Sequence, residues 1–142
     1  MLKLLIAVDG SEHARHAIEV AARLAREVPA TQVVLLNVRT PVTYYTEVPM
    51  YDFQSLDGLA QADQDRLLET AQTQARALGL AQVDLRSAVG QPAQEIVRVA
   101  SEAGVDQIVM GTRGMNALAG LLLGSVAQRV VHLAHVPVLL VK

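Results

Sequence analysis

The residues best suited to chemistry in this chain lie between positions 111 and 125. Gly111-Thr112-Arg113-Gly114 is followed by nine residues and then by Gly124-Ser125. Glycine lets a ligand come close to the backbone, and a helix that begins here would offer its unpaired N–H groups to an anion. Ser125 could cap that helix or turn its hydroxyl to a phosphate oxygen, while the planar guanidinium of Arg113 suits phosphate. This spacing predicts a phosphate-binding loop.

A carboxylate near the start of the chain could complete such a site. Asp9 follows the apolar run Leu4–Val8 and precedes Gly10 and Ser11. A carboxylate at the end of a strand can accept a hydrogen bond from a hydroxyl such as that of a ribose. Taken singly, each of these glycines and serines is explained better by an ordinary turn or helix cap than by a ligand. Taken together at one place, they indicate a ligand that carries both a phosphate and a sugar.

Alternating strands and helices are expected to bring these segments together. The predicted strands are Leu4–Val8, Val33–Leu36, Gln82–Val89, Ile108–Met110 and Val136–Val141. Segments with a helical period of apolar residues lie between them, at about 12–26, 55–78, 92–103 and 125–134. Strands that are apolar on both faces are typical of a parallel sheet covered by helices on each side.

The predicted fold is a single α/β domain over residues 1–142, with a doubly wound five-stranded parallel sheet of order 3-2-1-4-5. Ligands of such sheets bind outside the carboxyl ends of the strands, where the strand order reverses. In this order the reversal lies between the first and fourth strands. We therefore expect Asp9 and the segment that follows Met110 to meet there.

Composition and charge exclude several classes of protein. The 142 residues include 12 Lys and Arg against 14 Asp and Glu, so the chain lacks the basic surface that nucleic-acid binding requires. No run approaches the roughly 18 apolar residues of a membrane span, and Met1–Asp9 is too short and too charged for a secretory signal. The absence of cysteine excludes disulfides, a thiolate zinc site and cysteine catalysis. We expect a soluble, cytoplasmic protein.

Other motifs that bind phosphates or metals do not fit. A P-loop needs a lysine after its glycines, and the only lysines are Lys3 and Lys142. The turn after the first strand, Asp9–Glu12, lacks the glycines of a dinucleotide fingerprint. Two pairs of histidines three residues apart could bind a metal, but neither pair has an evident third ligand. We therefore predict no site for a bare metal ion.

The spaced glycines resemble a known signature. Gly111-x2-Gly114-x9-Gly124-Ser125 matches, without a gap, the nucleotide-binding motif of the universal stress protein family. The resemblance covers the whole chain, including the segments Ala7–Ser11, Gly90–Pro92, Asp106–Gly111 and His135–Val141. Within that family, this motif separates the branch that binds ATP from the branch that lacks the motif.

The resemblance implies an ATP site with a role for each residue. Asp9 would meet the ribose beside the backbone of Ala7, and Val38 and Met110 would meet the adenine. The residues implied around the phosphates are Gly111, Arg113, Gly114, Gly124, Ser125 and Val126. Family members carry various residues at the position of Arg113. Magnesium would arrive with the nucleotide phosphates, because no acidic pair looks built for a bare ion.

The implied function is that of an ATP-binding regulatory module in a stress response. No general base or water-positioning acid accompanies the phosphate loop, so efficient hydrolysis is not expected. Two alternatives remain open. One is a slow ATPase or nucleotide hydrolase in which Asp9 acts on a metal or on water, and the other is a ligand-free stress protein that binds protein partners.

Two surfaces could serve partners. Residues 39–54 are expected to form an irregular loop, either packed on the body or acting as a lid or partner surface. This loop holds all four aromatic residues, Tyr44, Tyr45, Tyr51 and Phe53. The last strand, Val136–Val141, is apolar throughout and would be an aggregation-prone edge unless covered. Two copies that pair about a two-fold axis would cover it, as in the family it resembles, so we expect a homodimer through this strand.

Overall fold

The computed structural model describes residues 1–41, 50–114 and 122–142, and for residues 50–53 it describes the backbone alone. The strands of these ranges are β1 (Lys3–Ala7), β2 (Gln32–Arg39), β3 (Gln82–Val89), β4 (Gln107–Gly111) and β5 (Val138–Val141). The helices are α1 (Glu12–Glu27), α2 (Met50–Ala77), α3 (Pro92–Ala103) and α4 (Ser125–Leu133). Neighbouring strands pair in parallel in the order β3-β2-β1-β4-β5, which confirms the predicted fold class.

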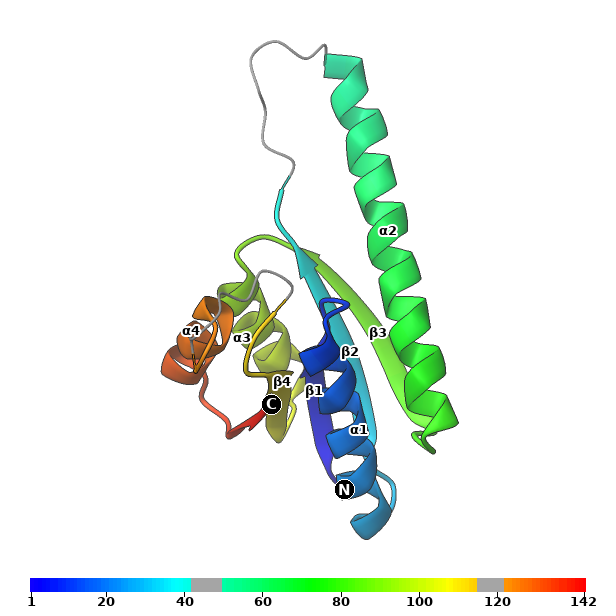
Figure 1. Ribbon diagram of the computed structural model, residues 1–142, viewed down its shortest axis with the longest axis vertical. Helices are drawn as coiled ribbons and strands as arrows, with labels where there is room; N and C mark the ends of the chain where they lie inside the picture. The colour runs from blue at the N-terminus through cyan, green and yellow to red at the C-terminus, as the bar shows by residue number, and fades with distance from the viewer. Residues whose placement is uncertain (42–49, 115–121) are drawn as a thin grey trace.

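Helices cover both faces of this sheet (Figure 1). Side chains of β1 alternate between the two faces, so Leu4 and Ile6 pack with residues of α1 and α2, whereas Leu5 packs with residues of α3 and α4. All three side chains are fully buried. Burial on both faces explains why β1 is a continuous apolar run rather than an alternating one.

The register of the strands brings the predicted site to one edge of the sheet. Ala7, the last residue of β1, pairs with Leu36 of β2, and Ile6 pairs with Val109 of β4. The chain leaves β1 after Ala7, while β2 continues to Arg39. The carboxyl ends of β1 and β4 therefore lie side by side where the strand order reverses, as the sequence predicts.

Helix α2 begins earlier than the sequence pattern indicates. It starts at Met50 rather than near Ser55, so the predicted aromatic loop is wrong over its last residues. Residues 50–54 contain neither Gly nor Pro, so nothing in them interrupts the hydrogen bonds of a helix. Two of the four aromatic residues thereby belong to α2. The other two, Tyr44 and Tyr45, lie outside the described residues.

Strand β5 begins two residues later than predicted, at Val138 rather than Val136. Pro137 has no N–H group, so strand pairing through backbone donors starts only after it. Its carbonyl still accepts a hydrogen bond from the Ile108 N–H of β4 at 2.9 Å. The strand predicted to form the dimer is therefore four residues long rather than six.

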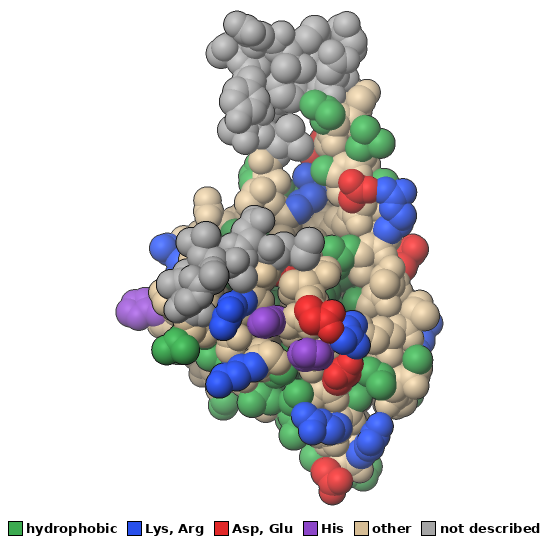
Figure 2. All heavy atoms as spheres, in the orientation of Figure 1, with side chains coloured by type: hydrophobic (Ala, Val, Ile, Leu, Met, Phe, Trp, Pro, Cys, Tyr) green, Lys and Arg blue, Asp and Glu red, His purple; other side chains and the backbone are tan. Residues whose placement is uncertain are grey.

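Charges of both signs cover the outer surface of α1. Figure 2 shows acidic, basic and histidine side chains interspersed there rather than gathered by sign. Arg15 pairs with both Glu12 and Glu19 on this surface. Within the described ranges, no helix combines the length and the apolar character that crossing a membrane requires.

Candidate functional site

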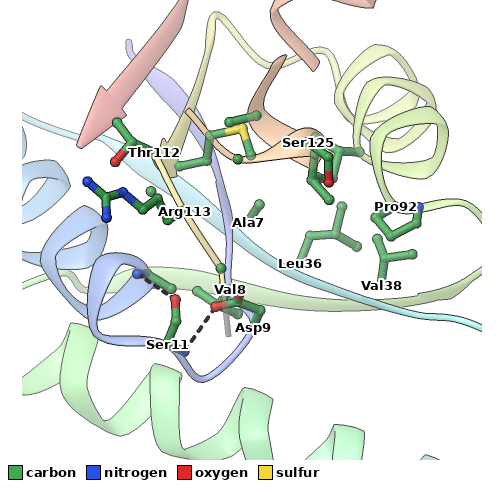
Figure 3. Close-up of a pocket in the computed structure, with 18 residues that line it drawn as sticks. Ala7, Val8, Asp9, Ser11, Leu36, Val38, Pro92, Thr112, Arg113 and Ser125 are labelled. Atoms are coloured by element: carbon green, nitrogen blue, oxygen red, sulfur yellow. Dashed lines mark hydrogen bonds between the residues drawn. The ribbon is translucent and has the colours of Figure 1, made fainter. Parts of the chain in front are cut away.

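A cavity of about 470 Å³ opens at the carboxyl ends of β1, β2 and β4, next to the start of α4 (Figure 3). This volume lies in the range usual for small-molecule sites, roughly 300–1,000 Å³. All ten residues that the sequence predicts as nucleotide contacts line it, namely Ala7, Asp9, Val38, Met110, Gly111, Arg113, Gly114, Gly124, Ser125 and Val126. The structure thus gathers the predicted residues in one place, while their contact with a ligand stays a prediction.

Two glycines of the motif pack closely against other segments, Gly111 against the Cβ and backbone of His13 and Gly114 against the carboxylate of Asp9. A Cβ atom at Gly111 would lie 2.6 Å from the Cβ of His13, and one at Gly114 would lie 2.6 Å from Asp9 Oδ2. Real Cβ atoms essentially never come closer than 3.0 Å to such neighbours. A side chain at Gly114 would therefore displace the carboxylate of Asp9. The motif glycine and the carboxylate from the first strand are parts of one packed unit.

Hydrogen bonds within the turn after β1 hold Asp9 in place, as the dashed lines in Figure 3 show. The Ser11 N–H donates to Asp9 Oδ1 at 2.9 Å, and Ser11 Oγ accepts from the Ala14 N–H at 3.2 Å, which caps α1. Gly10 has a φ of +83°, in the left-handed region that favours glycine. Asp9 itself is exposed at the cavity wall, where its carboxylate can accept a hydroxyl group of a ligand.

The two ends of the segment between β4 and α4 meet, because Gly124 is hydrogen-bonded to Thr112. The Gly124 N–H donates to Thr112 O at 2.6 Å, and the Thr112 N–H donates to Val141 O of β5 at 2.8 Å. These two bonds anchor both ends of the predicted phosphate loop on the sheet. Residues 115–121, between those ends, lie outside the described residues.

The N-terminus of α4 is open to an anion. Its N-cap residue is Gly124, and no described side chain caps it, so Ser125 does not take the capping role that was one of its two predicted uses. Ser125 is exposed, and with Val126 and Ala127 it lines the cavity. The unpaired N–H groups and the helix dipole of a first turn favour a bound anion.

Another part of the cavity is apolar. Leu36 and Val38 of β2 lie together with Pro92 of α3 on the side of Figure 3 away from Ser11. Leu36 O accepts the Val8 N–H at 2.8 Å, and alternate residues of a strand direct their backbone groups toward the same neighbour. The N–H and C=O groups of Val38 therefore point to the same side as those of Leu36, but β1 has no residue paired with Val38. An apolar wall beside backbone hydrogen-bonding groups suits a flat ring with a polar edge.

Arg113 lines the cavity without pointing to its centre. In Figure 3 its side chain extends away from Ser125 and Val38. Its Nε is buried and has no hydrogen-bond partner among the described residues. A buried, unpaired donor costs free energy until a ligand or water pairs with it. The contact of Arg113 with phosphate stays a prediction.

The charged side chains at the start of α1 pair with each other. The hydrogen bond from Arg15 lowers the pKa of the Glu12 carboxyl, and the same contact raises the pKa of Arg15. Neither side chain lines the cavity. Among the described lining residues, Asp9 is the only carboxylate.

Sequence reasoning did not assign a ligand contact to eight of the lining residues, which are Val8, Ser11, Ala14, Leu36, Pro92, Ile96, Thr112 and Ala127. Thr112 lies inside the glycine motif and Ser11 inside the turn after the first strand, so their position beside predicted residues could have identified both. The apolar residues have no comparable signal. In the sequence they look like any other core residues.

Comparisons with known proteins identify relatives along the full length of the chain. The model of the Universal stress protein family matches residues 1–142. Universal stress protein YxiE of Bacillus subtilis is 34% identical over 146 residues, which cover 99% of this chain and 98% of that protein. The solved structure of MJ0577, a Methanocaldococcus jannaschii protein, has a TM-score of 0.84 at 30% identity and covers 99% of this chain and 95% of its own. A universal stress protein solved in complex with cAMP has a TM-score of 0.75 at 26% identity, covering 99% and 97%.

Proposed function

This chain belongs to the universal stress protein family, and from that premise we propose that it binds ATP and acts as a nucleotide-dependent regulatory module of the stress response. The proposed site is the cavity at the carboxyl ends of β1, β2 and β4. The observation that carries the proposal is the make-up of that cavity, which has an apolar wall, a glycine-lined wall and a single described carboxylate.

The chemistry of the cavity matches the parts of ATP. Val38 and Met110 offer apolar contact to an adenine ring, and Asp9 offers an acceptor to a ribose hydroxyl. The start of α4, at Gly124 and Ser125, offers N–H groups and a hydroxyl to phosphates. Magnesium would arrive bound to those phosphates, with water completing most of its coordination.

A solved relative supports a nucleotide as the ligand. The universal stress protein in complex with cAMP shares the fold of this chain at 26% identity. That ligand contains an adenine, a ribose and a phosphate, which are the three groups that the cavity is suited to bind. We propose ATP because the spacing of Gly111, Gly114, Gly124 and Ser125 matches the family's ATP-binding motif.

Binding rather than efficient hydrolysis is the proposed role. Hydrolysis needs a group that orients the attacking water, and this proposal assigns the one carboxylate among the described lining residues, Asp9, to the ribose. Bound nucleotide would act by changing the stability of a homodimer through β5 or of a partner surface. A cytoplasmic location, as expected from the sequence, belongs to the same proposal.

A thermal-shift titration tests the proposal. Mg-ATP at about 100 times its Kd should stabilise protein stripped of nucleotide by roughly 2.7 kcal/mol, which for a chain of this size is a rise in Tm of about 5–11 °C. Gly124→Val should abolish most of that rise. A Cβ at this position already lies 3.2 Å from Thr112 O, and the added methyl groups would crowd the start of α4.

Gly58→Val is the matched control. A Cβ at Gly58 meets no atom within 4 Å, and the residue lies on an exposed part of α2. This variant should keep the full ATP-dependent rise, measured against its own Tm without ligand. No rise in the stripped parent protein would contradict the proposal and would favour the ligand-free, partner-binding alternative.

A further inference from the structure

Two buried amides lie behind the cavity without lining it. Asn37 is 7% exposed and Gln64 of α2 is 3% exposed. Asn37 Nδ2 donates to Val8 O at 2.7 Å. Gln64 Nε2 donates to Asn37 O at 2.9 Å and to Ala88 O at 3.0 Å. Burying polar groups of this kind is costly unless they are hydrogen-bonded. The two amide nitrogens make such bonds, whereas Gln64 Oε1 has no partner among the described residues. The bonds join α2, β2, β3 and the residue after β1 at the carboxyl edge of the sheet.

The acceptors of these bonds lie directly before two predicted nucleoside contacts. Val8 O belongs to the peptide unit that joins Val8 to Asp9, and Asn37 O belongs to the unit that joins Asn37 to Val38. The side chain of Asn37 thus holds the peptide unit that precedes Asp9. Its own carbonyl, before Val38, is fixed in turn by Gln64.

This network acts where the regular sheet has ended. The last pair between β1 and β2 is Ala7 with Leu36, and the Val8 N–H to Leu36 O bond follows it. Beyond this point β1 turns into the loop at Asp9, and the spacing between Asp9 and Val38 has no further strand pairing to set it. The Asn37 side chain provides the next connection between the two segments.

We propose that Asn37 is a positioning residue for the nucleoside half of the cavity, with Gln64 holding it from α2. The inference rests on the proposed nucleotide function and assigns a role that the sequence motif does not contain. Asn37 sets the distance between the carboxylate that accepts the ribose and the strand end that contacts the base. The start of α4, on the phosphate side of the cavity, is anchored by other bonds, from the Gly124 N–H to Thr112 O and from the Thr112 N–H to Val141 O of β5.

Asn37→Leu tests this role, because leucine keeps a similar volume but cannot donate to Val8 O. Isothermal titration calorimetry should show ATP affinity reduced about tenfold, which is the change in affinity that the loss of one hydrogen bond typically causes. Affinity for inorganic tripolyphosphate, which has no nucleoside, should stay at the parent's value. Gln64→Met should weaken ATP binding in the same direction, and it decides the question if Asn37→Leu does not fold.

Thr31→Val is the matched control. Thr31 is also buried, at 8% exposure, and its Oγ1 donates to Val28 O at 2.6 Å at the opposite end of β2. This variant loses one side-chain hydrogen bond in the turn that precedes β2 but should bind ATP as the parent does. A lower Tm with unchanged ATP affinity in Asn37→Leu and Gln64→Met would overturn the positioning role, as would an equal loss of ATP and tripolyphosphate binding.

The outcomes separate this inference from the function on which it rests. If the stripped parent protein does not bind ATP, both the proposed function and the role of Asn37 are overturned. If the parent and Thr31→Val bind ATP and the Asn37 and Gln64 variants bind it equally well, the function stands and only the positioning role is overturned.

Discussion

At the scale of single residues, Ser11 and Ser125 stand at the starts of two helices that border the same cavity. The hydroxyl of Ser11 accepts the Ala14 N–H and so caps α1. Ser125 lies one position further into its helix, because Gly124 occupies the N-cap of α4. The same residue type therefore caps one helix and lies in the first turn of the other without capping it.

Alanine substitutions distinguish these two serines. Ser11→Ala should lower the free energy of unfolding by about 1 kcal/mol, the usual cost of a lost N-cap. Ser125→Ala should change it by less than about 0.5 kcal/mol, as for an exposed residue whose side chain has no hydrogen bond to the described residues. Urea denaturation without ligand measures both. Equal losses would contradict the assignment of Ser125 to ligand binding.

At the scale of elements, α2 is divided along its length. Residues 54–59 are exposed throughout, whereas Leu68, Ala71 and Ala75 belong to the core on the α1 face of the sheet. Figure 1 shows the first part of α2 extending past the end of the sheet. The stability that α2 contributes should therefore come from its second half.

Two leucines of α2 provide a direct comparison. Leu68 is 3% exposed and Leu59 is 64% exposed. Leu68→Ala should lower the free energy of unfolding by about 2–5 kcal/mol, because it leaves a cavity in the core, and Leu59→Ala by less than about 0.5 kcal/mol. Chemical denaturation measures both values. A comparable loss for Leu59→Ala would show that another surface covers the first half of α2 in solution.

At the scale of the whole molecule, the two edges of the sheet differ in character. Edge strand β3 carries exposed charges at Asp84 and Arg86, which discourage pairing with another chain. The opposite edge strand, β5, carries no charge. Pro137 O accepts a hydrogen bond from Ile108 of β4 and Val141 O accepts one from Thr112, just after β4. The alternate residues Val138 and Leu140 therefore direct their backbone groups outward. These outward groups are the ones through which we propose that two copies pair.

Val138→Pro tests the dimer at that edge. Proline keeps an apolar side chain of similar size and leaves the bonds to β4 in place, but it removes the outward N–H of the strand. The variant should be a monomer by light scattering coupled to size exclusion. Val138→Ala keeps the N–H and should remain a dimer. A monomeric parent protein, or a dimeric Val138→Pro, would contradict a homodimer through β5.

The sequence by itself determined the fold class and ten of the residues that line the cavity. Runs that are apolar on both faces, alternating with helical segments, are typical of a covered parallel sheet. That sheet brings Asp9, Gly111–Gly114 and Gly124–Ser125 to one edge. Local patterns were less reliable at boundaries. Helix α2 starts at Met50 because no residue there interrupts it, and β5 starts at Val138 because Pro137 cannot donate.

Only the tertiary structure decided which buried residues bond to the segments that form the cavity. Asn37 bonds to Val8, 29 positions away, and Gln64 bonds to Asn37, 27 positions away. No periodicity or spacing in the sequence marks such partners, because the contact depends on where separate strands end relative to one another. The packing of Gly114 against Asp9 has the same origin. Sequence patterns indicate which face of each helix or strand is buried. Contacts between residues far apart in the sequence form only when the chain folds, so these patterns do not predict them.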